Sequence, residues 1–340
     1  MKCRPEHMLL FLASISGHDE FIKTRISEIV RDSVDWEYLK NSAEALGVAR
    51  GVWERLLQAG IIENSITSQL HEIAQHEMQK SESLSALYQQ ISSLLAKNGF
   101  NYIPLKGCDQ RISKGARKLF NPMDDIDILV RISDIEDIAQ LLEENEYHYQ
   151  GMFSGSHITF FTDEEIPRLI EIHWDLVNRS SPVQKILFHP SIDGIWDRSI
   201  SMGGESHLSL EDVLSYLTAH CIKEYFHKPK WLTDIVWILE HCSNEIDHLT
   251  AKMVMSEWGT SQALGIIVQG VKEILYEISF NKAWDFGARK PGLLGLYVAQ
   301  HLLCYDKLRN LRPLLFVASA ESLSSAFEVS AGMFKRFFRL

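Results

Sequence analysis

The sequence predicts an α+β fold, in which a small mixed β-sheet core is flanked by helical regions at both ends of the chain. Apolar residues recur at helical spacing over 6–60 and 66–97, as they do on the buried faces of amphipathic helices. Between residues 100 and 174, four short apolar runs have the length and alternation of strands. From Ser209 onward the pattern is helical again.

Three regions follow from this order of elements. A helical region is expected over residues 1–80, an α/β core over 81–205, and a helical domain over 206–340. A chain of 340 residues is long enough for two or three packed units. Neither a repeat of fixed period nor a low-complexity tract interrupts the sequence.

Local signals indicate where several elements begin and end. Gly47 can end the helix before it, because glycine adopts the left-handed backbone that often terminates a helix. A short helix over 108–119 is expected to end before Pro122. The segment Ser133-Asp-Ile-Glu136 has the spacing of a capping box, and Ser209 is placed to cap the helix that follows it.

Composition and charge limit the classes of protein to consider. The chain is 46% hydrophobic and 23% charged, as expected for a soluble globular protein. Its net charge of −11 opposes long-range attraction to nucleic acid or anionic membranes, without excluding a local basic groove. The five cysteines form no CxxC pair, which favours free thiols in a reducing cytosol over a structural zinc site.

The first residues have only a faint likeness to a secretory signal. Lys2 and Arg4 precede a short apolar run over 8–13, which passes directly into the polar segment 18–20. We therefore favour an opening amphipathic helix over a signal peptide. No run approaches the roughly 20 apolar residues that span a bilayer. We expect a cytoplasmic protein that does not engage a membrane.

One short stretch contains the strongest chemical pattern in the chain. Asp125 and Asp127 lie in the expected strand 125–130 and are separated by one apolar residue. Alternate side chains of a strand share a face, so the two carboxylates converge at roughly 7 Å of backbone spacing. They repel each other unless a cation lies between them. This arrangement is typical of a Mg²⁺ site.

A third acid and a lysine extend the pattern. Glu171 lies on a later strand and shares a face with His173. If the two strands are neighbours, the three carboxylates can hold one or two Mg²⁺ ions, which activate an attacking hydroxyl and neutralise a triphosphate. Lys106, in the turn after the first strand, can pair with phosphate oxygens. Gly107 allows the backbone and the next helix N-terminus to approach the same anion.

The residue pattern alone also allows simpler, non-functional interpretations. Surface strands often contain an Asp-x-Asp pair, and a Lys-Gly dipeptide indicates little by itself. Glu171 also suits a solvent-facing sheet edge, and His173 is as consistent with a hydrogen-bonded structural residue as with a nucleotide contact. Cys108 lies close to the expected site, but no histidine at a useful spacing supports a nucleophile there.

Taken together, the motifs resemble the uncharacterised nucleotidyltransferase family of bacteria, within the polymerase-β-like nucleotidyltransferase superfamily. Three central motifs and two flanking features give the resemblance, which covers roughly residues 30–245. They are Pro104-Leu-Lys-Gly107, Pro122-Met-Asp-Asp-Ile-Asp-Ile-Leu-Val130, Ile170-Glu-Ile-His-Trp174, Asp35-Trp36, and His220 with Lys230-Trp-Leu-Thr-Asp234.

The resemblance implies an activity and a role for each motif residue. Asp125 and Asp127 would be the paired metal-binding, catalytic carboxylates, and Glu171 the third. The implied reaction is Mg²⁺-dependent transfer of a nucleoside monophosphate from a nucleoside triphosphate such as ATP, with release of pyrophosphate. The acidic net charge favours a small-molecule, peptide or protein acceptor over RNA. The residues expected to bind the nucleotide are Lys106, Gly107, Asn121 and His173.

Two departures from the superfamily pattern concern the triphosphate. Gly107-Cys108 replaces the usual Gly-Ser or Gly-Gly, which removes one hydroxyl contact. Asn121 stands where the family often has arginine, and Arg111 or Arg117 is a candidate replacement for that charge. These departures leave the three carboxylates intact.

Two alternative functions therefore remain beside the leading one. The first is a toxin-like nucleotidyltransferase that modifies tRNA, for which the basic tail over 335–339 is the only hint. The second is a non-catalytic nucleotide-binding or scaffold protein with the same fold, which the altered Cys108 and Asn121 positions motivate.

Overall fold

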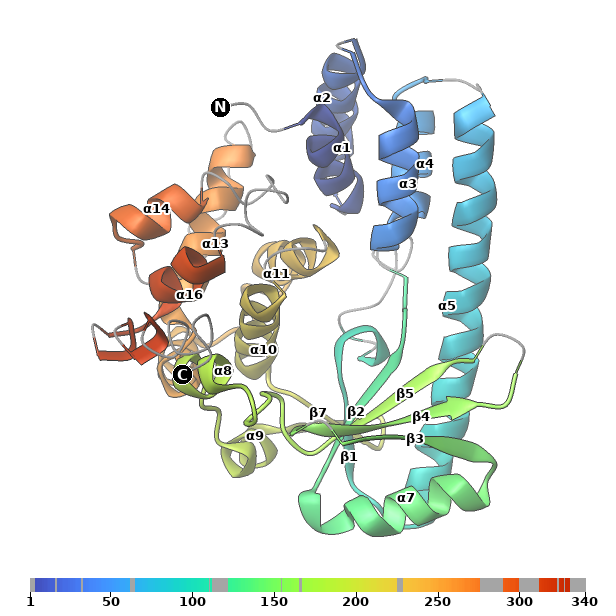
Figure 1. The fold of residues 1–340 in the computed structure, drawn as a ribbon, viewed down its shortest axis with the longest axis vertical. Coiled ribbons are helices and arrows are strands. Elements are labelled where there is room, and N and C mark those ends of the chain that lie inside the picture. The colour runs from blue at the N-terminus through green and yellow to red at the C-terminus, as the bar shows by residue number, and fades with distance from the viewer. Residues whose placement is uncertain are drawn as a thin grey trace.

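The chain folds into a mixed five-stranded sheet with helices before and after it in sequence, which confirms the predicted α+β fold (Figure 1). Asn121, Arg117, the basic tail and most of the expected helix over 108–119 lie outside the described residues. The structure is a computed structural model and describes residues 4–15, 17–31, 33–61, 65–109, 111, 122–153, 155–164, 167–224, 229–275, 290–299, 312–322, 324–326 and 328–330.

Five described helices precede the sheet, as the helical spacing predicted. In α3 the Asp35 carboxylate accepts a hydrogen bond from the Tyr38 N–H, and Gly47 ends the helix with a φ of 66°. The long helix α5 runs beside both the N-terminal helices and the sheet (Figure 1). The five are α1 (Pro5–Ser14), α2 (Asp19–Arg31), α3 (Trp36–Leu46), α4 (Ala49–Gln58) and α5 (Ser65–Lys97).

The sheet has the strand order β1-β2-β5-β4-β3. Its central neighbours β2 and β5 are parallel, and the other neighbouring strands are antiparallel. The parallel register places Asp127 directly opposite Glu171. The strands are β1 (Tyr102–Pro104), β2 (Ile126–Val130), β3 (Tyr147–Phe153), β4 (His157–Thr162) and β5 (Leu169–His173).

Two β features were not predicted from the sequence. The edge strand β3 has the sequence Tyr-His-Tyr-Gln-Gly-Met-Phe, which lacks a clean apolar alternation, and it is paired by β4 with a register shift. A separate hairpin joins β6 (Ile200–Met202) to β7 (Glu205–His207). Its turn residues Gly203 and Gly204 both have positive φ, as the tight turns of β-hairpins require.

The capping box expected at Ser133 is wrong. A 3₁₀ turn, Ile132–Asp134, precedes helix α7 (Ile135–Glu144), so Asp134 takes the N-cap position without a side-chain cap. Ser133 Oγ donates instead to Asp134 Oδ1 at 2.7 Å. The 3₁₀ turn delays the start of the helix by one residue, which puts the serine too early to cap it.

Helices follow the sheet from Ser209 onward, as predicted, whereas the two short helices Pro182–Leu187 and Ile192–Arg198 were not predicted from the sequence. Ser209 caps α10 as expected, because its hydroxyl accepts a hydrogen bond from the Asp212 N–H. The described helices are α8 (Pro182–Leu187), α9 (Ile192–Arg198), α10 (Leu210–Lys223), α11 (Pro229–His241), α12 (His248–Trp258), α13 (Ser261–Ile274), α14 (Leu293–Ala299) and α16 (Arg312–Ser319).

Two hydrophobic cores hold these elements together. One face of the sheet packs against α7 and the C-terminal half of α5, with Leu84 and Ile128 among its buried members. The other core joins the first four helices to α10–α13, with Leu10 and Leu217 among its buried members. The two helical regions therefore share one core, and α5 contributes to both, since its Leu70 belongs to the second. The region boundaries themselves stay a prediction.

Further expectations concern thiols and membranes. Cys108 and Cys221 are buried free thiols and Cys242 is buried as well, whereas Cys3 and Cys304 lie outside the described residues. Within the described ranges, no helix combines the length and apolar character that crossing a membrane requires.

Candidate active site

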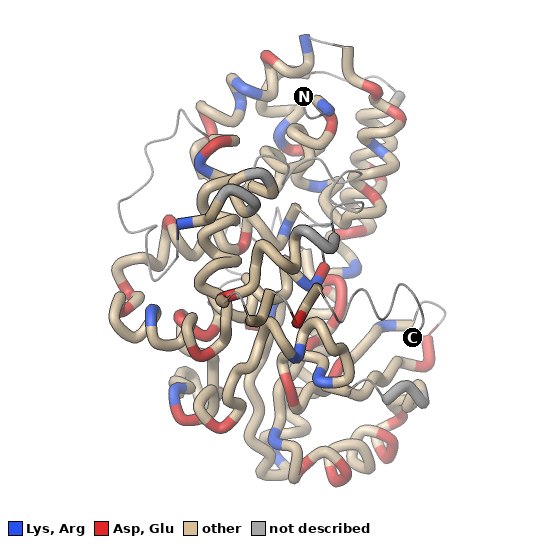
Figure 2. Tube along the Cα trace, turned by 60° about the vertical axis from the view of Figure 1, so that its left-hand side comes forward, with Lys and Arg blue, Asp and Glu red and all other residues tan. Residues whose placement is uncertain are grey.

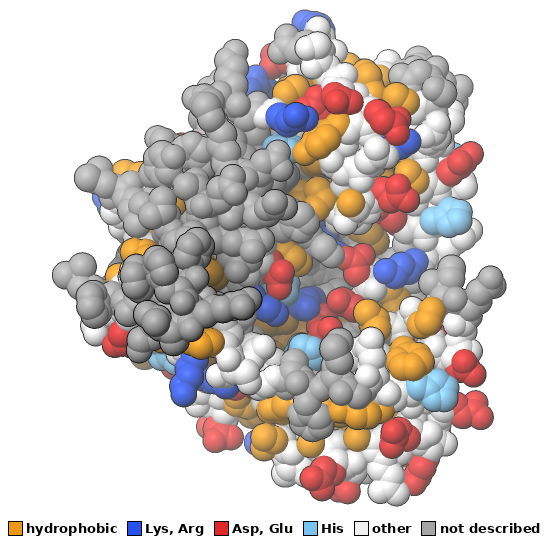
Figure 3. All heavy atoms as spheres, viewed as in Figure 1, with side chains coloured by type: hydrophobic (Ala, Val, Ile, Leu, Met, Phe, Trp, Pro, Cys, Tyr) orange, Lys and Arg blue, Asp and Glu red, His pale blue; other side chains and the backbone are white. Residues whose placement is uncertain are grey.

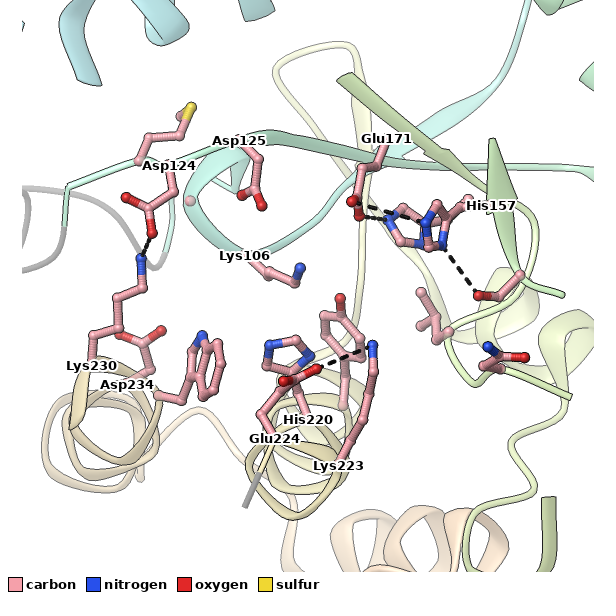
Figure 4. A pocket seen from close by; sticks show the side chains of 18 of the residues that line it. Lys106, Asp124, Asp125, His157, Glu171, His220, Lys223, Glu224, Lys230 and Asp234 are labelled. Carbon is pink, nitrogen blue, oxygen red and sulfur yellow. Dashed lines mark hydrogen bonds and ion pairs between the residues drawn. The ribbon is translucent and has the colours of Figure 1, made fainter. Parts of the chain in front are cut away.

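A polar pocket of about 290 Å³ lies where the sheet faces α10 and α11. Figure 3 shows acidic, basic and histidine side chains gathered in a hollow near the middle of this face. In Figure 4 the carboxylates of Asp125 and Glu171 approach the pocket from the sheet side, and His220 and Lys230 approach from the helices. The pocket lining includes Lys106, Gly107, Asp125, Glu171 and His173, all of which were predicted as site residues.

Asp127 lies at the buried base of this site. Only 1% of it is exposed, and its Oδ1 accepts hydrogen bonds from Lys106 Nζ and His173 Nε2, both at 2.9 Å. Its Oδ2 is buried and has no hydrogen-bond partner among the residues that the structure describes. An unpartnered buried carboxylate oxygen is costly, so this atom can accept a positively charged ligand.

The predicted third carboxylate, Glu171, lies beside Asp127. The two residues face each other across the parallel β2–β5 pair, and His173 Nε2 bridges them at 2.9 Å from Asp127 Oδ1 and 3.2 Å from Glu171 Oε2. Asp125 directly precedes β2, two residues before Asp127 and therefore on the same face. This strand geometry is the basis for the prediction that the acids share one face of the sheet.

The charges of the site shift one another's pKa values. The charge of Asp127, together with burial, raises the pKa of Asp125 to about 6. Burial acts to raise the pKa of Asp127 too, but Lys106 and the hydrogen bond from His173 hold it well below its usual range. Burial acts to lower the pKa of Lys106, which Asp127 nevertheless keeps raised. A cation between the two aspartates would relieve the repulsion that raises the pKa of Asp125.

The turn that holds Lys106 has an unusual backbone. Leu105 N–H continues the β1–β2 ladder by donating to the carbonyl of Asp127, and Lys106 then adopts a φ of 48°. Few residues other than glycine have such a φ, and the conformation costs about 1–3 kcal/mol. At Gly107, a Cβ atom would lie 3.2 Å from Met123 Cγ. The glycine therefore permits close packing of the turn against the segment that leads into the aspartates.

Histidine 157 is a site residue that the sequence reasoning missed. It lies directly opposite His173 in the antiparallel β4–β5 pair, and the ring centroids are 4.8 Å apart. One ligand atom each of His157, Glu171 and His173 lies within 4.8 Å of the other two. Its position at the start of a strand was visible in the sequence, but only the pairing register places it beside Glu171.

Residues of the surrounding helices hold Asp124, which directly precedes Asp125. Lys230 of α11 forms an ion pair with Asp124 (Figure 4). A Cβ atom at Gly47 would lie 3.3 Å from Asp124 Oδ1, so the end of α3 packs against the same carboxylate. Asp124 is thus held from both helical regions, immediately beside Asp125.

Aromatic side chains of α10 and α11 complete the wall. His220 and Trp231 line the pocket and pack edge to face, with ring centroids 4.5 Å apart. Burial and the charge of Lys106 keep the pKa of His220 well below its usual range, so this ring is neutral. Tyr216 and Asp234 also line the pocket. His220 and Asp234, both in a motif that carried the family resemblance, therefore line the cleft.

Two candidates for supporting roles are not brought into the pocket. Arg111 donates to Asp109 Oδ2 and to the Leu208 carbonyl, both at 2.6 Å, so it is engaged away from the described lining. Cys108 is 2% exposed, and burial raises the pKa of its thiol well above the usual range, which argues against a nucleophile.

Comparison with known proteins identifies the family. Residues 32–275 match the family described as "Uncharacterised nucleotidyltransferase", and the chain belongs to this family. The fold and the pocket thus belong to a protein of the nucleotidyltransferase class. None of the curated proteins matches the chain.

Two solved structures show a distant likeness. A protein from H. pylori, provisionally described as a nucleotidyltransferase, is 11% identical with a TM-score of 0.31, over 67% of this chain and 97% of that one. An antigenic nucleotidyltransferase-like protein from Paracoccidioides brasiliensis is 14% identical with a TM-score of 0.32, over 63% and 94% of the two chains. At these scores neither likeness bears on the chemistry of the site.

Proposed function

We propose that this protein is a Mg²⁺-dependent nucleotidyltransferase. It transfers a nucleoside monophosphate from a nucleoside triphosphate to a small-molecule, peptide or protein acceptor, and pyrophosphate leaves. Family membership supports the reaction class. The main structural support is that Asp127 lies opposite Glu171 on parallel strands, with Asp125 and Lys106 in the same pocket.

The donor types suit a hard divalent cation. Asp125, Asp127 and Glu171 offer carboxylate oxygens, which Mg²⁺ prefers, and Asp127 Oδ2 lacks a partner among the described residues. These three residues would hold one or two ions. A bound ion would supply charge that neutralises the triphosphate and activates the attacking hydroxyl.

The chain's own cations and rings supply the rest of the nucleotide site. Lys106 Nζ donates one hydrogen bond to Asp127 and has further N–H groups for a phosphate oxygen. Lys223 and Lys230 add positive charge to the pocket lining, and Trp231 offers an aromatic edge and face to a base. His173 orients Asp127 and Glu171 through its two short contacts. Its predicted contact with the nucleotide stays a prediction.

The charge distribution favours a small or peptidic acceptor over RNA. Figure 2 shows acidic and basic positions interspersed along the described chain. The net charge of −11 also opposes phosphate-backbone binding. The basic tail that motivated the tRNA alternative lies outside the described residues.

Label transfer tests this proposal. The protein is incubated with α-labelled nucleoside triphosphates, Mg²⁺ and fractionated cell extract, and label incorporation and pyrophosphate release are followed. We expect transfer by the wild type, loss with EDTA, and at least a hundredfold loss in Asp125→Asn and Asp127→Asn. Asp137→Ala, an exposed acid on α7, serves as the matched control and should behave as wild type.

The outcomes separate the alternatives. Label that appears in the tRNA fraction would favour the tRNA-modifying enzyme over the acceptor class proposed here. The absence of both transfer and metal-dependent nucleotide binding would overturn the proposal in favour of a non-catalytic protein.

A further inference from the structure

We infer that His157, Glu171 and His173 form a site for a first-row transition-metal dication, such as Mn²⁺, Co²⁺ or Zn²⁺, beside the aspartate pair. The inference rests on the proposed function, since Glu171 is one of its carboxylates. It adds a metal of different chemistry from Mg²⁺ and gives two histidines a direct role.

The geometry comes from strand register. His157 and His173 face each other across β4 and β5, and Glu171 lies two residues from His173 on the same face of β5. His157 Nε2 is 3.9 Å from Glu171 Oε1, and His173 Nε2 is 3.2 Å from Glu171 Oε2. Ligands at about 2.1 Å from a tetrahedral metal are roughly 3.4 Å apart. One ligand atom of each residue lies within 4.8 Å of the other two, so a coordinated set requires these atoms to approach one another by up to about 1.4 Å.

A neighbouring side chain orients His157 in the way that is common for metal-binding histidines. Ser156 Oγ lies 3.3 Å from His157 Nδ1, so the other ring nitrogen faces Glu171. A hydrogen bond to the second nitrogen is the usual way in which proteins orient a metal-binding histidine. Binding a metal through His173 Nε2 would replace the hydrogen bond that this nitrogen now donates to Asp127 Oδ1. The three ligands line the pocket and are reachable from it (Figure 4).

The donor types decide which metal is favoured. Mg²⁺ prefers oxygen ligands in a near-octahedral arrangement and keeps several waters. Imidazole nitrogen suits transition metals, and two histidines with one carboxylate form a ligand set common in such sites. The aspartate oxygens remain available to Mg²⁺, while the His157–Glu171–His173 set selects the softer ion.

Co²⁺ titration tests the inference, because bound Co²⁺ reports its ligands through visible absorption. Metal-free full-length protein is titrated with Co²⁺ alone and in the presence of a hundredfold excess of Mg²⁺. We expect one equivalent to give the intense absorption of a low-coordinate, nitrogen-ligated ion that Mg²⁺ does not displace. His157→Ala should weaken binding at least about tenfold and change the spectrum.

Controls keep the test interpretable. His148→Ala, an exposed histidine on β3 outside the pocket lining, should leave the Co²⁺ spectrum unchanged. His173→Gln is measured as a second variant, with circular dichroism confirming that each variant is folded. An unaltered spectrum and affinity in His157→Ala, or displacement of Co²⁺ by Mg²⁺, would overturn the inference.

Parallel label-transfer assays separate the two proposals. Transfer with Mg²⁺ but no nitrogen-ligated Co²⁺ would refute the histidine site and leave the proposed function standing. Nitrogen-ligated Co²⁺ with neither transfer nor metal-dependent nucleotide binding would support the site and refute the proposed function.

Discussion

We expect loss of the ion pair between Lys106 and Asp127 to lower the free energy of unfolding strongly. Lys106 Nζ lies 2.9 Å from Asp127 Oδ1, and the two side chains are 18% and 1% exposed. Lys106→Met keeps much of the side-chain length but removes the charge. It leaves Asp127 with only the hydrogen bond from His173 among its described side-chain partners.

The expected loss of stability follows from the burial of this ion pair. Removing one member of a buried ion pair typically destabilises a protein by about 3–5 kcal/mol, because the remaining charge is buried without compensation. His173 still donates to the same oxygen, so we expect a loss near the lower end, about 3 kcal/mol. That is a large share of a domain's total stability of about 5–15 kcal/mol.

Urea unfolding followed by tryptophan fluorescence measures this loss at pH 7. Asp127→Asn removes the orphaned charge, so the double variant should recover part of the stability, with a coupling of about 2 kcal/mol in the double-mutant cycle. Arg25→Met, which breaks an ion pair with the exposed Glu28 on α2, is the control and should leave the midpoint nearly unchanged. A loss of unfolding free energy below about 1 kcal/mol in Lys106→Met would refute the reasoning. So would effects of the two single variants that simply add in the double variant.

Two further predictions concern residues around the pocket. Gly47→Ala should destabilise the protein by about 1–2 kcal/mol in the same urea assay, because a φ of 66° disfavours a Cβ. The new methyl would also press on Asp124, so an unchanged midpoint would contradict this packing. Burial raises the pKa of Glu77 from 4.5 to about 7, so folding favours its protonated form. The free energy of unfolding should therefore fall as the pH rises from about 4.5 to about 7, and Glu77→Gln should remove this component. Identical pH profiles for the wild type and the variant would argue against it.

The helices and the central strands could be predicted because their signals are local. Helical spacing and the glycine at position 47 located the N-terminal helices, and Ser209 correctly located the start of α10. Strand alternation placed Asp125 and Asp127 on one face. The capping box at Ser133 failed because a 3₁₀ turn, which depends on how the chain leaves the sheet, displaced the helix start.

Strand β3 shows the limit of such local signals. Its residues alternate poorly, and pairing with β4 makes it a strand. His157 was missed for a related reason. A histidine at the start of a strand has no evident partner until the antiparallel register with β5 places it beside His173 and Glu171.

The sequence by itself determined most helices, the central strands and the acids that they contain, because side-chain period and capping chemistry act within a few residues. Only the tertiary structure decided which of these residues meet. His173 contacts Asp127 across 46 residues of sequence, and Lys230 pairs with Asp124 across 106. These meetings depend on the parallel β2–β5 register and on the packing of α11 against α1 and α10. Hydrogen bonding between strands and burial of the two cores select both for the whole chain.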